Sequence, residues 1–94
     1  MNKYEVVLII NYVEEEQTNN VIERFQKIIT DNGGTVDKVD NWGNRRLAYE
    51  IKDHNEGYYC FMEFTSPAST VKELDRVLKI TEDILKHMII RIEE

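Results

Sequence analysis

Two short segments of this chain are apolar on both faces of a strand, and this feature constrains the fold more than any other. In residues 3–11, KYEVVLIIN, apolar side chains fill odd and even positions, and residues 58–65, YYCFMEFT, show the same pattern. A strand with one solvated face alternates apolar and polar residues, whereas a strand that is apolar on both faces is usually central in its sheet. We therefore expect these two segments to be central strands.

Two helices are predicted from apolar residues that recur at steps of three and four, the spacing of one helical face. The first runs through residues 14–32; its glutamates 14–16 lie near the start, where the helix dipole favours negative charge, and NGG at 32–34 predicts a left-handed cap and turn. The second follows Ser66-Pro67, with Ser69 or Thr70 as its expected N-terminal cap. The predicted buried faces are Val21, Ile22, Phe25, Ile28 and Ile29 in the first helix and Val71, Leu74 and Leu78 in the second.

Residues 35–52 and 85–92 are the predicted outer strands. In the first of them, Trp42-Gly43 interrupts the pattern and indicates a bulge or bend. Beyond this break, Leu47, Tyr49 and Ile51 share one parity, and we expect all three in the core. Residues 52–57, KDHNEG, are polar and end in glycine, so they predict a hairpin loop closed by Gly57.

The predicted order of elements is strand, helix, strand, strand, helix, strand, which is one unit repeated twice. Right-handed crossovers in both halves give one compact solution, an α+β domain with a four-stranded antiparallel sheet and both helices on one face. Ninety-four residues form a single domain, residues 1–94. The opposite face of the sheet carries no helix, and apolar side chains there would mark a contact surface.

Composition excludes several classes of protein. Hydrophobic residues make up 41% of the chain, which suits a folded protein, and no apolar run reaches the roughly 18 residues of a membrane span. Cys60 is the only cysteine, so an internal disulfide is impossible. Within an apolar strand it is expected to be a small buried side chain. A cytoplasmic, reducing setting is the simplest expectation.

The formal net charge of −6 argues against generic binding of nucleic acid, because phosphate neutralisation drives that affinity. The adjacent cations Arg45 and Arg46 therefore require an explanation. Charged side chains on an edge strand commonly prevent aggregation between strands, and the spacing alone favours that role. Alternatively, the guanidinium groups bind RNA phosphates while Trp42 or Tyr49 offers a stacking surface. In that case a partner must supply the remaining positive charge.

Motifs for other functions are weak. EGYYCFMEF, residues 56–64, lacks the basic, small and aromatic residues of the RNA-recognition-motif signature at the positions that matter. His54 and His87 have no neighbouring ligands in the sequence, so no metal site and no cofactor are expected. Acylphosphatases share the order of elements, but they need a phosphate-binding loop where this chain has the acidic NYVEEEQ. A small-molecule or peptide-binding module and an acylphosphatase-like enzyme remain the alternatives.

The run GNRRLAYEIK, residues 43–52, resembles the signature of the bacterial small-subunit ribosomal protein family conventionally numbered six. Four other segments occur in that family's order and spacing, so the resemblance covers nearly the whole chain: KYEVVLIIN, NGGTVDKVDNWG, EGYYCFMEF and ELDRVLKITEDILKHMIIR. Trp42 departs from the family pattern, in which an aliphatic residue is common.

The resemblance implies a ferredoxin-like two-layer sandwich, no catalysis and a place in the small ribosomal subunit. It also implies a heterodimer with the ribosomal protein numbered eighteen that binds the central domain of small-subunit ribosomal RNA (rRNA), with no membrane and no small-molecule substrate involved. The basic partner would then supply much of the phosphate neutralisation. We expect RNA or partner contacts from Trp42, Arg45, Arg46 and Lys52.

Overall fold

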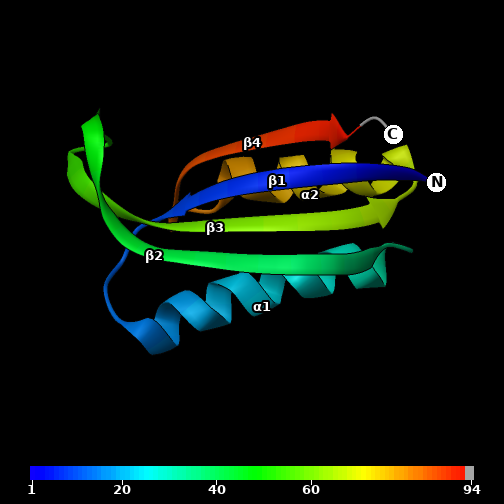
Figure 1. Cartoon of the computed structure of the whole chain (residues 1–94), viewed down its shortest axis with the longest axis horizontal. Helices are drawn as coiled ribbons and strands as arrows, with labels where there is room; N and C mark the ends of the chain where they lie inside the picture. The colour runs from blue at the N-terminus through cyan, green and yellow to red at the C-terminus, as the bar shows by residue number, and fades with distance from the viewer. Residues whose placement is uncertain (93–94) are drawn as a thin grey trace.

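The computed structural model describes residues 1–92 and confirms the predicted α+β fold. The elements are β1 (Asn2–Ile10), α1 (Glu15–Asp31), β2 (Thr35–Ile51), β3 (His54–Ser66), α2 (Ala68–Ile80) and β4 (Ile84–Ile92). They form one antiparallel sheet in the order β2-β3-β1-β4, with β1 and β3 central (Figure 1). Neither helix is long and apolar enough to span a membrane.

The core lies between the sheet and the two helices. Alternate residues of the central strands, including Val6, Leu8, Cys60 and Met62, are fully buried in it. Both helices pack their apolar stripes on this same face: Val21, Ile22, Phe25 and Ile29 from α1, and Leu74, Val77 and Leu78 from α2. Because the two stripes share one cluster with one face of the sheet, neither α1 nor α2 covers the other face.

The tip of the β2–β3 hairpin bends beyond the helices, toward the start of β4 (Figure 1). There Leu47 packs with Ile9 and Leu85 in a second, smaller apolar cluster. Lys52 Nζ donates a hydrogen bond to the Ile84 carbonyl at 3.0 Å, which ties the tip of the hairpin to β4. The hairpin is therefore anchored over one end of the helix-free face and does not project freely.

The predicted hairpin loop over residues 52–57 is wrong. The turn consists of Lys52 and Asp53 alone, with φ of 48° and 66°, and Ile51 already pairs with His54. A two-residue hairpin turn with positive φ at both central positions matches the right-handed twist of its strands. The polar residues after the turn belong to β3. A strand can be polar at this position because the side chains at the tip of the hairpin lie in solvent.

The role expected for Gly57 is also wrong. This residue lies within β3, opposite Arg45, and does not close a loop. A Cβ atom at Gly57 would lie 2.5 Å from Cγ2 of Ile9, a branched side chain with little freedom to move. Glycine is needed here because another side chain approaches the backbone closely.

Two features of β2 differ in how well the sequence predicts them. The bulge expected at Trp42-Gly43 is confirmed by a register shift between Asn41 and Gly43 and by φ of 85° at Gly43. The core position expected for Tyr49 is wrong, since 62% of its surface is exposed, whereas Leu47 is buried. Tyr49 lies in a stretch of β2 that pairs with no residue of β3, so parity does not place its side chain.

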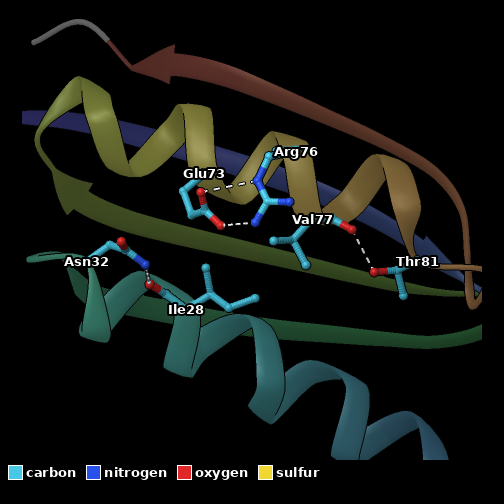
Figure 2. A network of polar contacts seen from close by, with 6 residues as sticks. All are labelled: Ile28, Asn32, Glu73, Arg76, Val77 and Thr81. Carbon is cyan, nitrogen blue, oxygen red and sulfur yellow. Dashed lines mark hydrogen bonds and ion pairs between the residues drawn. The ribbon is translucent and has the colours of Figure 1, made fainter.

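Polar side chains complete the helix ends (Figure 2). The predicted left-handed turn after α1 is confirmed at Gly33, with φ of 84°, and Asn32 Nδ2 donates to the Ile28 carbonyl at 2.7 Å. At the start of α2 the predicted cap is wrong. Pro67 occupies the cap position without a side-chain hydrogen bond, and Thr70 Oγ1 instead donates to the Asn32 carbonyl at 2.6 Å. Thr70 thus joins the two helices.

Candidate partner and nucleic-acid interface

The helix-free face of the sheet presents an apolar band bordered by charges. The strand register places these residues in two adjacent rows that cross β2, β3, β1 and β4. One row holds Asp40, Phe61, Val7 and Met88, and the next holds Lys38, Glu63, Glu5 and Ile90. We call this surface, together with Trp42, the open face.

Large apolar side chains of the open face lie in solvent. Trp42 is 47% exposed, Met88 50% and Ile90 44%, while Val7 and Phe61 are half-buried between them. Soluble proteins rarely expose apolar side chains side by side unless the surface is used for contact. The open face is therefore the candidate interface, as the topology predicts.

Trp42 reaches this face because the bulge in β2 places it beside Phe61, with ring centroids 4.8 Å apart. Its Nε1 donates to Oδ2 of Asp40 at 3.0 Å, which fixes the indole ring. Arg45 places Cζ 5.0 Å from the centroid of the indole, and Arg45 Nε donates to the Trp42 carbonyl at 3.3 Å. Trp42 and Arg45 thus form one preorganised aromatic and cationic unit.

Arg46 lies on the other side of the strand. In the register of β2 with β3, Arg45 pairs with Gly57 and Arg46 with Glu56, and adjacent residues of a strand point to opposite faces. Arg46 lines an open groove of about 440 Å³ at the end of the sheet. The other residues along this groove are Asn11, Tyr12, Asp53, His54, Asn55 and Glu56.

Beside this groove, the ring of Tyr12 stacks on the ring of Tyr58, with ring centroids 6.0 Å apart. Burial is the main cause that raises the pKa of the Tyr58 phenol above 10.0, and the nearby Cys60, Glu15 and Tyr12 add to the shift. The Tyr58 ring is therefore neutral at physiological pH.

Lys52 has a structural contact of its own. Its ammonium group bonds to the Ile84 carbonyl and so holds the tip of the hairpin. Of the four predicted site residues, the structure brings Trp42 and Arg45 together, separates Arg46 from them and engages Lys52 in the fold. Binding by each of the four remains a prediction.

Sequence reasoning missed two groups of charged residues. The first is the set of carboxylates on the open face, from Glu5, Asp40 and Glu63, which their parity relative to the buried residues could have revealed. The second joins β4 to α2, where Asp75 accepts hydrogen bonds from His87 Nε2 and Lys79 Nζ, both at 2.8 Å. Lys79, then His87, lowers the pKa of Asp75. The i, i+4 spacing of Asp75 and Lys79 on α2 could have revealed that pair, whereas no sequence signal joins His87 to Asp75.

The predicted buried role of Cys60 is confirmed. Its side chain is fully buried, and burial, with a smaller contribution from Asp40, raises the pKa of the thiol to about 11. Residues 1–92 contain no group of three or more histidine, cysteine, aspartate or glutamate side chains arranged to bind a metal ion.

Comparisons with known proteins agree with this architecture. Residues 3–91 match the family model described as Ribosomal protein S6. The chain is 53% identical to the small ribosomal subunit protein bS6 of Alkaliphilus oremlandii, with all of both chains covered. It is 46% identical to that of Moorella thermoacetica, over 100% of this chain and 97% of the relative.

A solved structure shows the same fold. The crystal structure of 30S ribosomal protein S6 from Thermotoga maritima superposes with a TM-score of 0.91 at 36% identity, covering 97% of this chain and 87% of that one. This match confirms the predicted ferredoxin-like arrangement. The chain therefore belongs to the ribosomal protein S6 family and is a structural component of the small ribosomal subunit in the cytoplasm, not an enzyme.

Proposed function

We propose that this protein binds small-subunit rRNA, in its central domain, as a heterodimer with the basic ribosomal protein numbered eighteen. The observation that carries the proposal is an exposed apolar sheet face on a chain with a net charge of −6. Such a face suits a protein partner, because apolar side chains and carboxylates give little affinity for phosphates.

The cations of this chain are too scattered to hold RNA alone. Arg45 and Arg46 are exposed but point to opposite faces, and Lys52 is hydrogen-bonded to the backbone of β4. RNA affinity grows with the number of phosphates that lysine and arginine side chains neutralise together. A basic partner docked beside Arg45 would extend a single cation into a continuous positive surface.

Arg45 is the cation best prepared for such a composite surface. Its guanidinium is held by the indole and carbonyl of Trp42, so little conformational entropy is lost when it binds a phosphate or a partner. Among residues 1–92 nothing supports Arg46 in this way, and it lies on the edge strand β2, where it also discourages pairing with another chain. We therefore expect Arg45 to contribute more to binding than Arg46.

The test measures the affinity of a labelled central-domain rRNA fragment for this protein, for the purified partner and for an equimolar mixture, at physiological salt. We expect weak binding by this protein alone and binding at least about a hundredfold tighter by the mixture than by either component. An rRNA fragment from another domain is the control for sequence-independent attraction. Tight binding by this protein alone, unchanged by the partner, would contradict the proposal.

A further inference from the structure

Two glutamates are paired across the central strands of the open face. Glu5 of β1 is directly opposite Glu63 of β3 in the register of the two central strands, and both side chains are half-buried. Like charges directly opposite each other in an antiparallel pair are destabilising. A folded protein that keeps such a pair on its exposed surface carries a stability cost that a bound cation would relieve.

The described part of the chain makes no direct ion pair with either glutamate. Within residues 1–92 neither carboxylate forms a hydrogen bond or an ion pair with another side chain, although Lys38 is opposite Glu63 in the strand register. The two glutamates lie in a groove of about 220 Å³. Its other lining residues are Lys38, Asp40, Trp42 and Phe61, so three carboxylates and one lysine give the groove a charge of −2.

We propose that this groove receives an arginine side chain of the partner protein, an inference that rests on the proposed function. A planar guanidinium matches the site, because it can bond to two carboxylates and lie against an aromatic ring such as Phe61 or Trp42. Apolar residues beside the groove, Val7 and Met88, would receive the aliphatic neighbours of that arginine.

Charge decides between this occupant and two others. An RNA phosphate at the groove would meet three carboxylates, and the repulsion would cost affinity. A second copy of this chain would bring another molecule of net charge −6 against the same face. A cationic segment of a protein is the one occupant whose charge relieves the repulsion between Glu5 and Glu63.

The test uses two substitutions, and each is expected to raise the stability of the free protein and to weaken its binding to the partner. In Glu5→Gln and in Glu63→Gln, the like-charge pair is lost, so we expect the melting temperature of the free protein to rise by about 2 to 5 °C. The same variants should bind the purified partner about tenfold more weakly, because the groove has lost a carboxylate that the arginine would contact. The matched control is Glu23→Gln on the exposed surface of α1, where neither quantity should change.

Unchanged or tighter partner binding in both variants would contradict the proposal that the groove receives an arginine of the partner, while leaving the proposed function intact. Failure of the unmodified protein to bind the partner at all would overturn both. RNA binding by this protein alone that falls in the variants, or a homodimer that the variants dissociate in sedimentation, would assign the groove to RNA or to a second copy. Weaker partner binding with a higher melting temperature is the result that supports the proposal.

Discussion

Arg45 and Arg46 are neighbours in the chain but belong to different surfaces of the molecule. Arg45 lies over the indole of Trp42 on the open face, and Arg46 lines the groove that contains Tyr12 on the other side of β2. Two adjacent strand residues cannot grip one phosphate together, since their side chains point about 180° apart. The two arginines that stand out in the sequence therefore belong to two separate surfaces.

The first prediction follows from this separation. Arg45→Ala should weaken the complex with partner and RNA more than Arg46→Ala does, because only Arg45 is preorganised on the open face. We expect a loss of about tenfold for Arg45→Ala, with little change in melting temperature for either variant. Affinity of the heterodimer for the rRNA fragment measures the effect. If the double variant assembled normally but aggregated, the arginines would instead serve to prevent the edge strand from pairing with another chain.

Gly57→Ala tests the close approach of β3 to Ile9. The added methyl group would force Ile9 or the backbone to move, so we expect a loss of about 1–3 kcal/mol in the free energy of unfolding. Urea titration measures this loss. Ala48→Ser, at an exposed position of the same hairpin, is the control and should change stability by less than about 0.5 kcal/mol. Equal stability of the two variants would contradict the steric explanation.

Cys60 should be chemically silent in the folded protein. Its thiol is fully buried and its pKa is raised to about 11, so the reactive thiolate is scarce and inaccessible at pH 8. Ellman's reagent should therefore label the native protein only as fast as the protein unfolds, and should label it at once in concentrated denaturant. Rapid labelling without denaturant would show that β3 opens locally.

Acidification should remove a small contribution from Asp75. Its pKa in the folded protein lies below the ordinary 3.8, chiefly because of Lys79 and then because of His87. A lowered pKa means that the stabilisation is present above about pH 4 and is lost as the pH falls through the folded value. Since Asp75 is partly in solvent, we expect only about 0.5 kcal/mol.

Urea unfolding of the native protein and of Asp75→Asn, compared between pH 6 and pH 2.5, measures this contribution. The gap in stability between the two proteins should close on acidification. A gap that stayed constant over this range would show that the contribution of Asp75 to stability does not depend on the charge of its carboxylate.

The sequence predicts the fold well because the fold depends on local patterns. Two-sided apolar runs identify the central strands β1 and β3, the helical period identifies α1 and α2, and NGG identifies the end of α1. The apolar runs and the helical period record burial averaged over many residues, and NGG is a local signal for a left-handed turn. Errors of one or two positions at the ends do not change which elements pack together.

The details of the candidate site could not be predicted in the same way, because they depend on contacts between residues distant in sequence. Gly57 is constrained by Ile9, which lies 48 positions earlier, and the opposition of Glu5 to Glu63 depends on the register of β1 with β3. The exposure of Tyr49 follows from the unpaired stretch of β2. The face on which Arg45 lies depends on the bulge at Trp42-Gly43, which shifts the register of β2 against β3.

Mapping the partner's footprint by NMR tests the account most directly. When the basic partner is added to isotope-labelled protein, the side-chain signals of Trp42, Phe61, Met88 and Ile90 should shift, and those on the outer surfaces of α1 and α2 should not. Such a pattern would place the partner on the open face. Shifts confined to the helices, with the Trp42 indole and the Met88 methyl unchanged, would contradict the central claim.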